Sequence, residues 1–174
     1  MKLDYLDLVL VHEPYRGYKE MYRALEDAYK EGKIRAAGVS NLNRRLYDEL
    51  LESCEVVPAV NQVECHVYFP QLAYKDYLEE KGTLMESWGP FTEGRRNIFR
   101  ERVLNEIAEA HNKTSGQIAL RYLVQNGIVV IPKTSKEERM KENLDLFDFS
   151  LSEEEMKRIS ALDGRKSLFG WYEQ

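Results

Sequence analysis

The chain has 174 residues, of which 43% are hydrophobic and 32% charged, and its formal net charge is −5. This length suits one well-buried domain rather than two, and the negative charge argues against a general nucleic-acid binder, which needs a basic face. No apolar run approaches the roughly 18 residues that span a bilayer, and we expect no signal peptide before Leu3. The two cysteines lack metal-type spacing and favour a reducing, cytoplasmic environment.

Five short apolar runs predict strands, and each is followed by a segment whose apolar residues have helical spacing. The expected strands are 5–11, 34–39, 59–64, 83–88 and 128–131. The expected helices are 18–31, 43–53, 70–81, 99–111, 114–127, one that begins just after Ser135, and one from Ser152 to about Leu162. Thr114 with Gln117, and Ser152 with Glu155, have the spacing of capping boxes. Two helices therefore precede the fifth strand, and residues 164–174 form a tail.

Strands that alternate with helices predict an α/β fold with a parallel sheet and right-handed crossovers. In such sheets, ligands and catalytic groups collect at the carboxyl ends of the strands. All five expected strands end in polar or aromatic residues: His12, Ser40 with Asn41, Gln62 with Glu64, Trp88, and Lys133 with Thr134. Five successive strand ends of this kind predict a functional site at that edge.

The segment 128–143 contains the most specific local signal, because an apolar strand leads directly into a helix start rich in cations. Ser135 and Glu138 have capping-box spacing, and Lys133, Lys136 and Arg139 surround the expected helix N-terminus. A helix N-terminus with nearby cations and hydroxyls favours an anion, most naturally a phosphate. The alternative is an ordinary strand-to-helix turn with solvated lysines.

The other candidate residues also have plain structural interpretations. His12 alone fits a buried, hydrogen-bonded histidine, Ser40 with Asn41 fits a helix cap, and Trp88 alone fits a core residue. His66 has the character of a surface or packing residue. No cluster of histidines, cysteines or carboxylates has metal-ligand spacing, so the sequence predicts no metal site.

Five segments, in order, resemble the aldo-keto reductase family of the bacterial or prostaglandin F synthase-like type. They are LVLVHEP, GKIRAAGVSNL, AVNQVECHVYF, LMESWGPF and IVVIPKTSKEERMKENLDLFDFSLSEEEM. The resemblance implies a TIM (β/α)8 barrel that binds NADP(H) without a glycine-rich dinucleotide motif. The chain would be an incomplete barrel with about five of eight strands. Residues 1–174 would then form a single domain that lacks the three N-terminal βα units.

The same resemblance implies a role for each matched residue. His12 matches the active-site histidine that orients the substrate carbonyl, and Glu13 lies where a substrate-pocket Trp is usual. The matched cofactor residues are Ser40, Asn41 and Gln62 for the nicotinamide carboxamide, Trp88 for stacking on the nicotinamide, Lys133, Thr134, Ser135 and Arg139 for the 2′-phosphate, and Glu142 with Asn143 for the adenine.

Two functions follow from the resemblance. The first is NADPH-dependent reduction of a small aldehyde or ketone to an alcohol. The second is a catalytically incompetent cofactor-binding or structural remnant, because the Asp, Tyr and Lys of the family's active site match nothing in this chain. Open sheet edges would in either case favour self-association or cover by an N-terminal segment.

Overall fold

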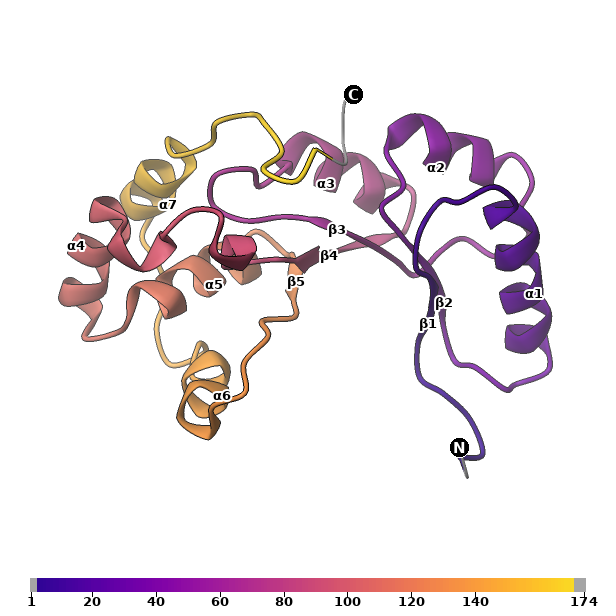
Figure 1. The fold of residues 1–174 in the computed structure, drawn as a ribbon, viewed down its shortest axis with the longest axis horizontal. Helices are drawn as coiled ribbons and strands as arrows, with labels where there is room; N and C mark the ends of the chain where they lie inside the picture. The colour runs from indigo at the N-terminus through magenta and orange to yellow at the C-terminus, as the bar shows by residue number, and fades with distance from the viewer. Residues whose placement is uncertain (1–2, 171–174) are drawn as a thin grey trace. The chain divides into compact units, whose positions relative to one another are not determined.

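The computed structural model describes residues 3–170, and its five strands form one sheet in the chain order β1-β2-β3-β4-β5 (Figure 1). The strands are β1 Val9–Val11, β2 Ala37–Ser40, β3 Val60–Glu64, β4 Leu84–Trp88 and β5 Val129–Val130. Pairing is parallel between β1 and β2 and between β2 and β3. The predicted α/β fold with a parallel sheet and alternating helices is confirmed.

Seven α-helices and two short 3₁₀ helices are present in the described part of the chain. They are α1 Tyr18–Lys30, α2 Arg44–Leu51, α3 Leu72–Glu80, η1 Thr92–Gly94, η2 Ile98–Arg100, α4 Arg102–His111, α5 Ser115–Gln125, α6 Glu137–Leu144 and α7 Glu153–Ser160. Both halves of the predicted capping boxes are made at α5 and at α7. The expected helix from residue 99 begins instead with η2, and α4 follows at Arg102.

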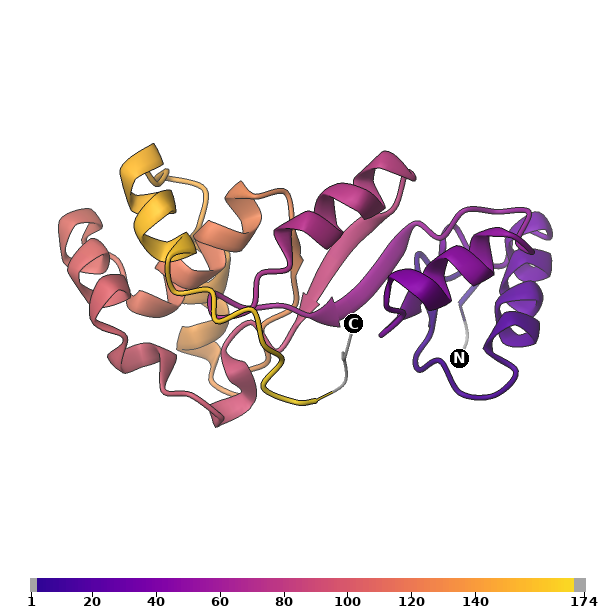
Figure 2. The same ribbon diagram turned by 90° about the horizontal axis from the view of Figure 1, so that it is seen from above.

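The described chain falls into two compact units. The first unit comprises residues 3–63 and 73–86, and the second comprises residues 64–72 and 87–170. In the first unit, α1 packs against β1 and β2 (Figure 1). Tyr22, Val39 and Tyr47 are fully buried in the core of this unit. In the second unit, α4 packs against α5 and α7, as the cluster of helices in Figure 2 shows.

Gly38 allows the strands of the first unit to approach one another closely. It pairs with Leu10 in the parallel register of β1 and β2. A Cβ atom at this position would come within 2.9 Å of the Val60 carbonyl oxygen and still closer to the Leu10 side chain. Only glycine fits here without moving the neighbouring strands. The strand ends on which the first unit's candidate residues lie therefore depend on this close approach.

Candidate functional site

Ser40 is the last residue of β2, Asn41 follows it, and both bind to the neighbouring strand β3. The Ser40 hydroxyl donates to the Gln62 carbonyl oxygen at 3.0 Å, and the Asn41 backbone N–H donates to the same oxygen at 2.8 Å. Asn41 has φ of 59°, a left-handed conformation that Asn tolerates better than most residues. Both residues are buried, at 1% and 8% exposure. They form a rigid strand end in the first unit.

The predicted cap at Ser40 and Asn41 is wrong. The N-cap of α2 is Asn43, whose side-chain oxygen accepts the Leu46 backbone N–H at 3.0 Å. The Asn41 side chain instead donates to Glu13 Oε1 at 2.8 Å. Glu13 Oε2 is buried and has no hydrogen-bond partner among the described residues. The carboxylate that was expected at a substrate-pocket wall is therefore partly engaged with a candidate cofactor residue.

Gln62 has a fixed side-chain orientation in the first unit. Its Nε2 donates to Glu86 Oε1 at 2.6 Å, and Glu86 is 8% exposed. Because the amide nitrogen of Gln62 donates to the Glu86 carboxylate, the side-chain oxygen of Gln62 remains available to accept a hydrogen bond from a ligand. The Ser40 hydroxyl can also accept while it donates to the Gln62 carbonyl. Two acceptors thus lie at paired positions of the adjacent strands β2 and β3.

His12 directly follows β1, as predicted, but the structure exposes it rather than burying it. No hydrogen bond to its ring is present within the described residues. The interpretation of His12 as a buried, internally satisfied histidine is therefore wrong. An exposed imidazole after a strand end can reach a ligand without first breaking a contact inside the protein.

Trp88 is the last residue of β4 and belongs to the second unit. Its ring is half-buried and packs against the Phe169 ring, with centroids 4.9 Å apart and an interplanar angle of 70°. The Arg95 guanidinium lies over the Phe169 ring at 4.6 Å from its centroid. Edge-to-face packing of this kind is a favoured aromatic geometry.

The segment between β5 and α6 is exposed, and its capping differs from the prediction. Helix α6 begins at Glu137 with Lys136 as N-cap and without a side-chain cap, so the expected box of Ser135 and Glu138 is wrong. The Thr134 hydroxyl accepts the Lys136 backbone N–H at 3.2 Å and thereby sets the turn before the helix. Lys133, Ser135 and Arg139 are exposed, as binding to an external anion requires.

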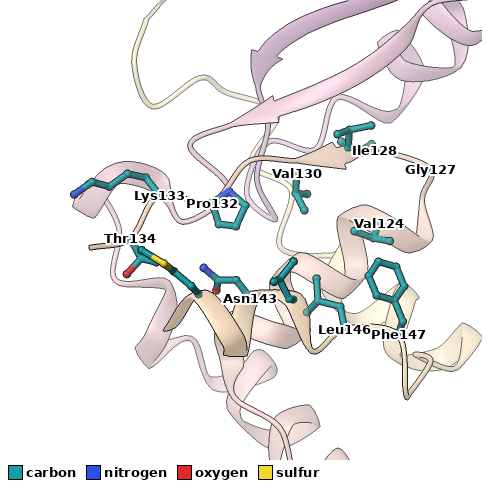
Figure 3. A pocket seen from close by; sticks show the side chains of 13 residues that line it. Val124, Gly127, Ile128, Val130, Pro132, Lys133, Thr134, Asn143, Leu146 and Phe147 are labelled. Atoms are coloured by element: carbon teal, nitrogen blue, oxygen red, sulfur yellow. The ribbon is translucent and has the colours of Figure 1, made fainter. Parts of the chain in front are cut away.

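Glu142 and Asn143, which were expected at the adenine, lie near the end of α6. The Glu142 carboxylate accepts a hydrogen bond from the Thr114 hydroxyl at the N-cap of α5. Asn143 lines a pocket of about 780 Å³ in the second unit (Figure 3). Lys133, Thr134 and Asn143 form the polar end of this pocket, as Figure 3 shows, and most of the remaining lining is apolar: Val124, Gly127, Ile128, Val129, Val130, Pro132, Met140, Leu144, Leu146 and Phe147.

A buried charged group at the end of β3 was not assigned a role from the sequence. The Glu64 side chain is fully buried and lies 3.0 Å from His66 Nε2, which is also fully buried. Burial acts to raise the pKa of Glu64, but hydrogen bonds from His66, Ser167 and the Leu168 backbone N–H hold it below the ordinary value. The available signal was a glutamate between two apolar residues, Val63 and Cys65.

The described part of the chain contains no group of three or more histidines, cysteines or carboxylates that could hold a metal ion. No helix within residues 3–170 is long and apolar enough to cross a membrane.

The profile of the Aldo/keto reductase family matches residues 1–164. Glyoxal reductase of Bacillus subtilis is 48% identical over 164 residues, which cover 94% of this chain and 59% of that protein. MGS-M4, an aldo-keto reductase from a Medee basin deep-sea metagenome library, superposes with a TM-score of 0.93 at 38% identity and covers 99% of this chain and 66% of its own.

A crystal structure of a Gox0644 variant in complex with NADPH superposes with a TM-score of 0.86 at 36% identity, over 92% of this chain and 59% of that one. The chain thus spans about three-fifths of the length of the proteins that it matches. Three observations point to the same family: its profile matches almost the whole chain, the identity to a relative is high, and the fold consists of parallel βα units. The chain therefore belongs to the aldo-keto reductase family.

Proposed function

We propose that this chain carries cofactor- and substrate-binding residues of a reductase that uses NADP(H) to convert a small aldehyde or ketone to an alcohol. The observation that carries the proposal is the pair of acceptors at paired positions of β2 and β3, Ser40 Oγ and the Gln62 side-chain oxygen, in a chain of this family. Membership supports an oxidoreductase, and the NADPH complex of a structural neighbour supports the choice of cofactor.

The residues present fit a nicotinamide carboxamide. A carboxamide offers two N–H donors and one acceptor, and it needs complementary groups in a site of low water content. Ser40 and Gln62 offer acceptors, and Asn41 adds an amide beside them. In the first unit we therefore assign these three residues to the carboxamide and His12 to the substrate carbonyl. Glu13 is assigned to the wall of the substrate pocket.

The residues of the second unit fit the nicotinamide ring, the 2′-phosphate and the adenine. Lys133 and Arg139 are exposed cations that can pair with a phosphate, Arg139 through its planar fork. Thr134 and Ser135 add hydroxyls, and Asn143 lines the polar end of the pocket beside Thr134. We assign Trp88 to stacking on the nicotinamide, Lys133, Thr134, Ser135 and Arg139 to the 2′-phosphate, and Glu142 with Asn143 to the adenine.

Bound NADPH would supply the hydride for the reduction. The role of this chain is to bind and orient the reactants. A hydrogen bond from His12 would stabilise the negative charge that develops on the carbonyl oxygen.

The proposal also covers the organisation of the protein. We include in it that residues 1–174 form one incomplete barrel domain, that the protein is cytoplasmic, and that it associates with itself or with an N-terminal segment like that of the family.

Nucleotide preference tests this proposal. Titration of the chain should give tighter binding of NADPH than of NADH, because only NADPH has a 2′-phosphate. Loss of a charge-assisted contact typically costs about 1.5–3 kcal/mol, so Arg139→Ala should weaken NADPH roughly ten- to a hundredfold and leave NADH nearly unchanged.

Lys141→Ala is the matched control, because Lys141 is an exposed cation on the same helix that pairs with Glu137 at 2.9 Å. It should bind both nucleotides like the unmodified chain. Equal losses of NADPH and NADH affinity in Arg139→Ala would show that this residue does not contact the 2′-phosphate.

A further inference from the structure

The buried Glu64 carboxylate holds the segment that follows α7. Its Oε1 accepts the Leu168 backbone N–H at 2.8 Å and lies 3.0 Å from His66 Nε2, and its Oε2 accepts the Ser167 hydroxyl. Gln71 Nε2 donates to the backbone carbonyl of Glu64 at 2.6 Å. A carboxylate that is removed from water needs several such donors, so both the strand end and the later segment are fixed by it.

Ser167 organises the next two residues with the same hydroxyl. Its Oγ accepts the Phe169 backbone N–H at 3.1 Å and the Gly170 backbone N–H at 2.8 Å. These contacts make a compact turn centred on Ser167. The hydroxyl therefore connects the Glu64 carboxylate to the conformation of Phe169.

Phe169 in turn bounds the ring of Trp88. The two rings pack edge to face at 4.9 Å, and the Arg95 guanidinium covers the Phe169 ring at 4.6 Å. Aromatic and cation–π contacts of this kind restrict ring orientation. A continuous series of contacts thus leads from Glu64 through Ser167 and Phe169 to Trp88, entirely within the second unit.

We infer that Glu64 is a positioning residue, which fixes the segment 167–170 so that Phe169 holds the Trp88 ring in one orientation. The importance of this orientation for the nicotinamide rests on the function proposed above. The arrangement of Trp88 itself does not, because the contacts that define it are made by residues of this chain.

The segment offers a direct readout of its attachment. Arg165 and Lys166 are exposed, and they lie between two anchors, the Gly164 backbone N–H on the Tyr68 carbonyl at 2.9 Å and the Leu168 backbone N–H on Glu64. Trypsin cleaves after arginine and lysine, so the release of the C-terminal peptide reports how often this segment opens.

The experiment uses Trp171→Phe as background, which leaves Trp88 as the sole tryptophan of the chain. In this background, Glu64→Gln should speed release of the C-terminal peptide roughly tenfold or more, since it replaces a charged acceptor of several donors. It should also shift the Trp88 emission to longer wavelength, as should Phe169→Ala. Ser167→Ala, a milder change, should act in the same direction and decides the matter if Glu64→Gln does not fold.

Glu26→Gln is the matched control. Glu26 is also buried, at 3% exposure, and its Oε1 accepts the backbone N–H groups of Glu55 at 2.6 Å and Val56 at 2.7 Å in the first unit. It should leave peptide release and Trp88 emission unchanged. If Glu64→Gln and Ser167→Ala match the parent in both measurements, or if Glu26→Gln shifts them equally, Glu64 is not a positioning residue for Trp88.

Nucleotide titration of the same variants separates this inference from the proposed function. If the parent binds NADPH, the variants that move Trp88 should bind it several-fold more weakly, and unchanged affinity would overturn the role of Glu64 in the cofactor site. If the parent binds no nucleotide, the proposed function fails, while peptide release and emission still decide whether Glu64 positions Trp88.

Discussion

The candidate polar residues of β2 and β3 differ from those that follow β5 in how firmly the protein holds them. Ser40 and Gln62 are tied to neighbouring groups by hydrogen bonds of 3.0 and 2.6 Å, whereas Lys133 and Arg139 are exposed. The first region can receive a ligand with little ordering, but the long cationic side chains of the second lose rotamer freedom when they bind. Substitutions should therefore affect stability and binding together in the first region, and binding alone in the second.

The largest expected effect concerns the proton donor of the reaction. The resemblance implies that the family's proton-donating Tyr lies outside the five matched segments, and a positioned general acid typically contributes about 10²–10⁴-fold to the rate. We expect residues 1–174 alone to reduce a simple aldehyde with NADPH at least that much more slowly than an ordinary reductase, and His12→Ala to abolish the residual activity. Turnover at about 1 s⁻¹ or faster, an ordinary enzymatic rate, would disprove this expectation.

The next largest expected effect is on self-association of the chain, which should depend on the exposed apolar side chains of the second region. Leu144 and Phe147 line the pocket and are 75% and 74% exposed. Burial of such a side chain contributes about 1.5–3 kcal/mol, so a double Leu144→Ser, Phe147→Ser variant should shift sedimentation markedly toward monomer. Tyr15→Ser, which alters a 65% exposed side chain of the first unit, is the control. A parent chain that is monomeric at all concentrations would contradict self-association.

Gln62→Ala tests whether the first region couples stability to binding. The substitution leaves the buried Glu86 carboxylate without the Gln62 donor, so unfolding in urea should show a loss of about 1–3 kcal/mol. NADPH and NADH affinity should fall together, because both nucleotides carry the carboxamide. Arg139→Ala should instead change stability by no more than about 0.5 kcal/mol, as expected of an exposed residue. Stability losses of equal size in the two variants would remove the distinction between the regions.

The smallest expected effect is a difference in how stability depends on pH. Because the folded-state pKa of Glu64 is below its ordinary value, its stabilising contribution is present above about pH 4.3 and is lost as the pH falls through the folded pKa. The pKa of the exposed Glu106 is also lowered, chiefly by its hydrogen bond with Arg102, and this surface interaction is screened by salt.

Urea unfolding at several pH values would distinguish the two carboxylates. Glu64→Gln should reduce the loss of stability below about pH 4.3 at low and at high salt, whereas Glu106→Gln should do so only at low salt. The same salt dependence for both variants would show that Glu64 is not shielded from solvent.

The elements and their order could be predicted from the sequence, because helix and strand patterns and capping boxes involve residues that are close together in the chain. The caps at Thr114 and Ser152 are made as predicted, and the family suggested by five ordered segments is confirmed. The predicted start of α6 was wrong because the hydroxyl of Thr134, and not that of the adjacent Ser135, accepts the Lys136 backbone N–H and sets the turn before the helix. Even there the error was about one residue.

Which polar groups form hydrogen bonds with each other could be known only from the folded structure. Glu64 and Ser167 are 103 residues apart, and no local pattern marks them as partners. Likewise, no local pattern marks Gln62 and Glu86 as partners. Gly38 must be glycine because Val60, on another strand, lies close to it. Hydrogen bonds and steric contacts between distant segments depend on the path of the folded backbone, which periodicity and propensity along the chain do not specify.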